Sequence, residues 1–105
     1  MTTRSFFVGD RRSIVRVQTG LRMEKRILLV LKALAGFLDL SLGDLLEGIV
    51  LHAFEGKAPF GPPTLATIRA LREVYGLDLV AADSHELSED EPAAPKPKRR
   101  RPRER

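Results

Sequence analysis

The side chains best suited to recognition chemistry lie in one short alternating segment near the N-terminus. Val15, Val17 and Thr19 fall on one face of this segment, and Arg16 and Gln18 fall on the other. An arginine can donate two hydrogen bonds to guanine, and a glutamine can both donate to and accept from adenine. The segment therefore presents two side chains of the types that contact base edges, opposite an apolar face of β-branched residues.

A strand of this length needs a partner, because a single strand cannot satisfy its own backbone hydrogen bonds or stand alone in water. No other segment of the sequence offers a convincing second strand. We therefore predict that residues 14–19 pair with the same strand of a second copy. Gly20 is expected to mark the bend out of the strand.

Two consecutive amphipathic segments follow the alternating segment. Apolar residues recur at helical spacing over residues 22–38, and again from Leu42 to about Phe54. Ser41 is the expected N-cap of the second helix, with Asp44 as the acid of a capping box. The predicted buried stripe of the second helix consists of Leu42, Leu45, Leu46, Ile49, Val50, Ala53 and Phe54. Since the first helix is apolar over much of its girth, we expect an intertwined dimer.

A linker rich in proline and glycine precedes a third predicted helix, which Thr64 would cap and Gly76 would end. Residues 77–80 are expected to be extended, and residues 81–87 to add a weak helical turn. From Ser88 onward the sequence shows no core-forming pattern, and its prolines favour disorder.

The charge of the chain is strongly segregated. Its 105 residues carry a formal net charge of +4. Residues 77–95 are acidic, whereas the last ten residues are basic, a pattern that indicates contact with a polyanion or mutual neutralisation. There is no cysteine, which excludes disulfides and fits a reducing cytoplasm. The longest apolar run, residues 27–31, is too short to span a bilayer, so we expect no membrane association.

No set of residues has the spacing of a catalytic centre. The chain has no glycine-rich phosphate loop, no serine with a plausible histidine partner and no histidine pair at metal-binding spacing. His52 is interpreted as structural or exposed. His85 lies near Asp83 and Glu86, but their spacing matches no strong metal motif. We therefore predict that the protein is not an enzyme, and that it has no catalytic residues, no metal site and no cofactor.

Residues 14–19, the helix over residues 22–38 and the segment 39–46 together resemble the ribbon–helix–helix family of DNA-binding proteins, of the Arc/MetJ type. The resemblance covers residues 13–56. It implies a mainly α fold with one short N-terminal strand that pairs across a homodimer and two core helices. This chain adds one C-terminal helix and a disordered basic tail. The predicted organisation is a leader (1–12), a dimerisation and DNA-binding domain (13–56), a helical extension (57–87) and an acidic-then-basic tail (88–105).

The resemblance also implies a set of DNA contacts. Arg16 and Gln18 would contact base edges in the major groove. The backbone N–H groups at the start of the second helix would bind phosphate, as helix N-termini commonly do. Two features depart from the family: the interval between strand and second helix is about two residues longer, and Asp44 lies where it would repel phosphate. The predicted phosphate contacts are Arg22, Lys25, Arg26, Ser41, Leu42 and Gly43.

The basic tail is a further candidate DNA contact, because cationic side chains release counterions from DNA. The alternative is a solubilising terminus with no specific partner. The tail residues concerned are Lys96, Lys98, Arg99, Arg100, Arg101, Arg103 and Arg105.

Two hypotheses for function follow. The first is a homodimeric, sequence-specific regulator of transcription that binds double-stranded DNA in the cytoplasm, at the nucleoid. It would act as a repressor, with an antitoxin as a subtype whose C-terminal helix binds a toxin or another protein. The second is an α-helical homodimeric adaptor that makes protein contacts and never touches DNA. Pairing of residues 14–19 across a dimer would favour the first hypothesis, and a loose segment would favour the second.

Overall fold

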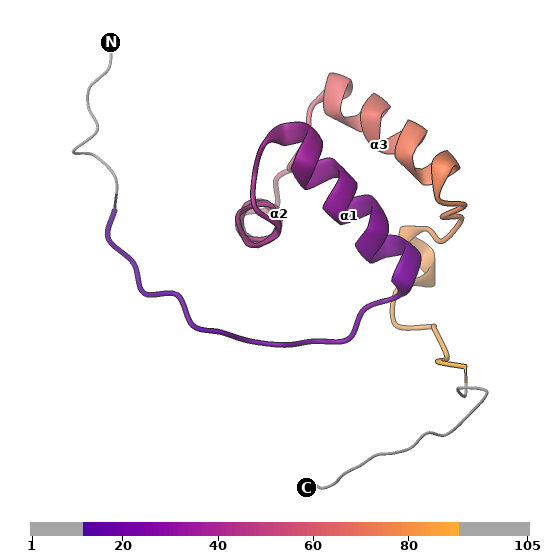
Figure 1. The fold of residues 1–105 in the computed structure, drawn as a ribbon, viewed down its shortest axis with the longest axis horizontal. Helices are drawn as coiled ribbons and strands as arrows, with labels where there is room; N and C mark the ends of the chain where they lie inside the picture. The colour runs from indigo at the N-terminus through magenta and orange to yellow at the C-terminus, as the bar shows by residue number, and fades with distance from the viewer. Residues whose placement is uncertain (1–11, 91–105) are drawn as a thin grey trace, which may run out of the picture.

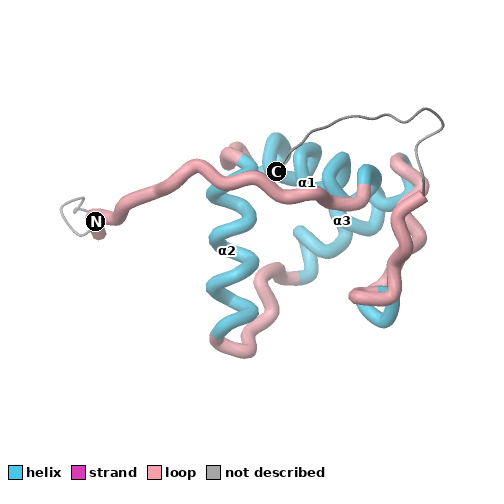
Figure 2. Tube along the Cα trace, turned by 90° about the horizontal axis from the view of Figure 1, so that it is seen from below, coloured by secondary structure: helices cyan, strands magenta, loops and turns pink. Residues whose placement is uncertain are grey.

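The computed structural model describes residues 12–90, in which three α-helices are followed by a short 3-10 turn (Figure 1). The helices are α1 (Lys25–Leu38), α2 (Leu42–Phe54) and α3 (Pro62–Val74), and the turn is η2 (Ala81–Asp83). α1 is central, because α2 and α3 each pack against it while their own backbones stay apart within the described residues. α3 runs alongside α1 (Figure 1), whereas α2 is turned crosswise to α1 (Figure 2).

α1 begins three residues later than predicted because a glutamate caps it. The Glu24 carboxylate accepts hydrogen bonds from the backbone N–H groups of Arg26 and Ile27, at 2.8 and 3.0 Å. The helix ends at Asp39, which adopts the left-handed conformation with φ 61°. There the Asp39 N–H donates to the Gly36 carbonyl and the Leu40 N–H donates to the Ala35 carbonyl. These two hydrogen bonds end the helix, and the chain then turns directly into α2.

The predicted bounds and cap of α2 are confirmed. Ser41 Oγ accepts a hydrogen bond from the Asp44 backbone N–H at 3.0 Å. Gly56 follows the helix with φ +71°, a conformation that glycine adopts without strain. Among the described helices, α2 packs only against α1.

α3 begins at Pro62, two residues before the predicted cap Thr64, which lies inside the first turn instead. Gly61 is the N-cap, and proline is favoured at the first helical positions because its missing N–H would have no partner there. Gly76 ends the segment with φ +63°, as predicted. Of the helical turn predicted over residues 81–87, the structure forms the 3-10 turn Ala81–Asp83.

The predicted ribbon strand is wrong: the residues that the structure describes contain no β-strand, and residues 12–24 lack regular secondary structure. This segment, which we call the arm, follows an open path outside the helices (Figure 1). Val15 on it is 90% exposed. The ribbon–helix–helix assignment is therefore corrected to an arm followed by three helices, while the expectation of a mainly α fold is confirmed. Alternation alone cannot make a strand where no second backbone supplies the ladder hydrogen bonds.

The core is small and centred on α1. Leu34, Ala35 and Leu45 are its buried cluster, and Leu34 is only 2% exposed. Side chains from all three helices and the linker pack against the cluster: Leu31, Leu38, Ile49, Phe60, Ile68 and Leu71. Leu34 on α1 thus belongs to the one cluster against which side chains of both α2 and α3 pack.

We expect Leu34→Ala to lower the free energy of unfolding by about 2–5 kcal/mol, the usual effect of a cavity at a buried leucine. Urea denaturation followed by circular dichroism measures this change. Leu65→Ala on α3 is the matched control, because Leu65 is exposed and its truncation creates no cavity. Equal losses for the two variants would contradict the assignment of the core.

Candidate functional site

The arm crosses the first half of α2 and is held there by Arg16 (Figure 2). Its guanidinium donates from Nε to Glu47 Oε2 at 2.9 Å and from Nη2 to Glu47 Oε1 at 2.8 Å. A longer contact of 3.5 Å joins Nη2 to Asp44 Oδ1. The structure thus brings Arg16, a predicted base contact, next to the N-terminal turn of α2, where phosphate contacts were predicted.

The Arg16–Glu47 pair is electrostatically matched but exposed. The hydrogen bond to Glu47 and the charge of its carboxylate raise the pKa of Arg16, and the same hydrogen bond lowers the pKa of Glu47. The Arg16 side chain remains 60% exposed. Solvent therefore screens the pair, which positions the arm without contributing much to stability.

The other predicted DNA-contacting side chains do not gather around Arg16. Gln18 is exposed on the arm. Arg22 forms an ion pair with Glu89 in the C-terminal segment. Arg26 binds Glu24 at 2.9 Å and Asp78 at 3.1 Å, and it also donates to the Gly76 carbonyl.

These contacts make Arg26 a structural clasp between the start of α1 and the segment after α3. Its hydrogen bonds with Glu24 raise the pKa of Arg26. Burial raises the pKa of Glu24, but the hydrogen bonds from Arg26 and the Ile27 backbone N–H outweigh it and lower that pKa overall. Both groups are therefore charged at neutral pH and engaged with each other, which leaves Arg26 poorly placed for phosphate.

The N-terminus of α2 presents an unfavourable electrostatic environment for an anion. The Asp44 N–H already donates to Ser41 Oγ, and Gly43 is exposed with open space above it. The carboxylates of Asp44 and Glu47 flank this turn and would repel a phosphate. Acidic residues also outnumber basic ones over residues 12–90, so the net positive charge of the chain comes from its two ends. The predicted tail contacts, residues 96–105, lie outside the described residues.

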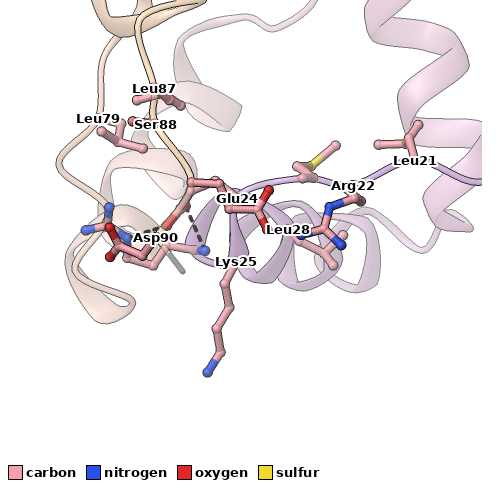
Figure 3. A pocket seen from close by; sticks show the side chains of 12 residues that line it. Leu21, Arg22, Glu24, Lys25, Leu28, Leu79, Leu87, Ser88 and Asp90 are labelled. Atoms are coloured by element: carbon pink, nitrogen blue, oxygen red, sulfur yellow. Dashed lines mark hydrogen bonds and ion pairs between the residues drawn. The ribbon is translucent and has the colours of Figure 1, made fainter. Parts of the chain in front are cut away.

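An open cavity of about 880 Å³ lies between the start of α1 and the C-terminal segment (Figure 3). Leu21 stands on one side and Leu79 and Leu87 on the other, while Lys25 points away from the cavity. Two ion pairs lie among its lining residues, Arg22 with Glu89 and Arg26 with Glu24. The cavity is thus an open gap beside the start of α1 in which these four charged groups already have partners.

Neither histidine belongs to a group of potential metal ligands among the described residues. His52 Nδ1 lies 2.7 Å from the Gly48 carbonyl one turn earlier in α2. Within residues 12–90, no three acidic, histidine or cysteine side chains lie close enough together to hold a metal ion. Over the same residues, none of the helices has the length and hydropathy needed to cross a membrane.

One surface feature was missed by the sequence analysis: exposed apolar side chains in the second half of α2. Val50 and Phe54 were predicted to be buried, but they are exposed, Phe54 to 80%. Leu51 is exposed beside them, three residues before Phe54. Further exposed apolar side chains occur on the arm and along the rest of the fold: Ile14, Val15, Val17, Leu21, Phe37, Leu40, Leu65, Val74, Val80 and Leu87. A single chain with so many uncovered apolar groups indicates an interaction surface.

Comparisons of the chain with protein-family models, with curated protein sequences and with solved structures found no match. The geometry described above is therefore the basis for any function assigned to the chain.

We expect the arm to detach from α2 in acid. Because the folded pKa of Glu47 is lowered from 4.5, the pair is present above that ordinary value and is lost as the pH falls through the lowered pKa. Backbone NMR relaxation of residues 15–19 measures the detachment as increased motion. Glu47→Gln should free the arm already at neutral pH, whereas Glu55→Gln, a control further along the chain, should not. Unchanged arm motion in Glu47→Gln would show that Arg16 does not hold the arm.

Proposed function

We propose that this chain is an α-helical protein-interaction module that assembles as a homodimer. The observation that carries the proposal is the ratio of exposed to buried apolar side chains. Among the hydrophobic residues within 12–90, only Val30, Leu34, Ala35, Leu45 and Leu77 are buried. Larger apolar side chains, with Phe54 and Phe37 among them, remain in contact with water.

The magnitudes support assembly over a free monomer. Full burial of one large apolar side chain contributes about 1.5–3 kcal/mol. Ordering each residue's backbone opposes folding by about 1–2 kcal/mol. A core of this size therefore leaves little net stability, and small domains in this position usually gain it by oligomerisation. Burial of the exposed side chains against a second copy would supply that stability.

Two glycines inside helices also support assembly. Gly36 lies in α1 and Gly48 in α2, and a Cβ atom added to either would meet no neighbouring atom within 4 Å. Glycine inside a helix costs about 1 kcal/mol relative to alanine. Among the described residues, no neighbouring atom requires a glycine at either position. Close approach of a second molecule would account for both.

The arm also lacks sufficient support within one chain. Its contact with the body consists of exposed ion pairs at Arg16 and Arg22, while Val15 and Val17 are exposed. Exposed ion pairs contribute too little to offset the entropy lost when the arm is ordered. A partner that covers these valines would provide the missing apolar contact.

We expect the full chain to sediment as a dimer that dissociates on dilution, with thermal stability that rises with protein concentration. Analytical ultracentrifugation over a wide concentration range measures the first property, and differential scanning calorimetry measures the second. A monomer at every concentration, with a midpoint independent of concentration, would contradict the proposed assembly.

A second candidate function is the binding of double-stranded DNA by a transcriptional regulator. The observation that favours it is the position of Arg16 beside the N-terminal turn of α2. DNA binding at this place requires Arg16 to exchange its carboxylate partners for DNA, and the exposed pair permits such an exchange. The cations of residues 96–105 would supply sequence-independent attraction.

For this candidate we expect Arg16→Ala to weaken binding to a preferred duplex by about 1–3 kcal/mol and to relax the preference at one base pair. Removal of residues 96–105 should weaken binding to preferred and random duplexes equally and flatten the salt dependence. Fluorescence anisotropy at two salt concentrations measures both effects. If the wild-type chain binds no duplex at low salt, DNA binding is excluded and only the interaction module remains.

A further inference from the structure

We propose that the exposed side of α2 is the homodimer interface, and that the α2 helices of the two copies pack against each other in antiparallel orientation. This inference rests on the proposed homodimer and names the surface that forms it. The occupant is a second copy of the same helix. α2 suits this role because α1 is the one described helix that packs against it, whereas α1 has both α2 and α3 as neighbours.

The interface side of α2 is a single stripe. Gly43, Glu47, Val50 and Phe54 follow one another at steps of three or four residues, which places them on one side of the helix. All four are exposed. Leu45, the buried residue of α2, lies on the other side, toward α1. Val50 and Phe54 are free for a partner, whereas Glu47 is held by Arg16 of the arm, so a partner seated along the whole stripe must displace this exposed contact. Binding on this side leaves the packing of α2 against α1 in place.

Two copies of the stripe have complementary shapes when they run in opposite directions. Its C-terminal end carries the largest side chain, Phe54, and its N-terminal end carries none, at Gly43. A Cβ atom added at Gly43 would meet only Ser41 Oγ, at 4.0 Å, so the space above this turn is open. In an antiparallel pair, Phe54 of each copy lies over Gly43 of the other. In a parallel pair the two phenylalanines would meet each other and the glycines would leave a gap.

Charge supports the same orientation. Asp44 and Glu47 lie in the first half of α2, and Lys57 follows its end. All three side chains are about half exposed or more. Within each chain Arg16 pairs with both acids and Lys57 pairs with Glu55, and these exposed pairs can be exchanged in an assembly. Antiparallel packing places each lysine beside the acidic half of the other copy and opposes the two helix dipoles favourably. Parallel packing would bring the four carboxylates together.

The surface is tested by matched substitutions in the full chain. Phe54→Ser should raise the dimer dissociation constant on the order of tenfold or more, the effect of removing an aromatic anchor. Val74→Ser is the control, because Val74 on α3 is 73% exposed and lies off the stripe. Phe37→Ser tests α1 as the competing surface. Circular dichroism checks that each variant retains its helices.

The orientation is tested by disulfide formation, for which the chain is well suited because it has no cysteine of its own. Lys57→Cys and Leu40→Cys are prepared as separate chains and then mixed under oxidising conditions. In the antiparallel pair, position 57 of one copy lies beside position 40 of the other. Two copies of position 57 are separated by roughly 25 Å along the helices, too far for a disulfide. We therefore expect cross-linking in the mixture and none in either variant alone.

Each outcome has a distinct meaning. Loss of the dimer in Phe54→Ser alone, with cross-links only in the mixture, supports the antiparallel interface. Dissociation in Phe37→Ser or Val74→Ser with no change in Phe54→Ser overturns the α2 surface, while the proposed homodimer stands. Cross-linking of Lys57→Cys with itself overturns the orientation. A wild-type chain that is monomeric throughout overturns both this inference and the proposed function.

Discussion

Every helix of the described chain is held in place through α1. Leu34 and Ala35 on α1 and Leu45 on α2 form the buried cluster, and α3 reaches it through Ile68 and Leu71. Since the backbones of α2 and α3 do not meet, the far side of each is left without a neighbour. The central position of α1 therefore explains both how the fold forms and why so much apolar surface stays exposed.

The same arrangement explains the behaviour of the arm. Because it precedes α1 and has no strand to pair with, its position depends on side-chain charges, chiefly Arg16 with Glu47. An exposed ion pair sets a direction for the segment but does not bury its valines. Arg16 is thus a positioning contact in the single chain, and the same guanidinium is the group that a DNA-binding function would need to release.

Charge distribution separates the two functional hypotheses. Acids neutralise Arg16, which the sequence suggested for base contact, and Arg22 and Arg26, which it suggested for phosphate contact. The folded body is then a poor polyanion-binding surface, and the cations of residues 96–105 carry the positive charge. On α2, Glu47 is likewise paired with Arg16, whereas Val50 and Phe54 stay exposed. Within the described residues nothing covers these two apolar side chains, which is why we favour protein interaction as the proposed function.

Local signals in the sequence determined most of the helical structure. The Ser41 cap, the bounds of α2 and the left-handed glycines Gly56 and Gly76 follow from hydrogen bonds and conformational preferences within a few residues. The sequence also determined the mainly α class through its helical periodicity. The late start of α1 and the early start of α3 depended on competition between nearby caps, such as Glu24 and Gly61, which periodicity does not resolve.

Only the tertiary structure decided which apolar residues are buried and which charges are paired. An amphipathic pattern marks a face of a helix but does not say whether another element covers it, so Val50 and Phe54 read as core residues and proved exposed. Alternation in residues 14–19 likewise marks a segment able to form a strand, while a strand needs a second backbone that the described chain does not provide. Glu47 pairs with Arg16, Glu89 with Arg22 and Asp78 with Arg26, each from a distant part of the sequence. Contacts over such separations are set by how the helices pack, which no local pattern encodes.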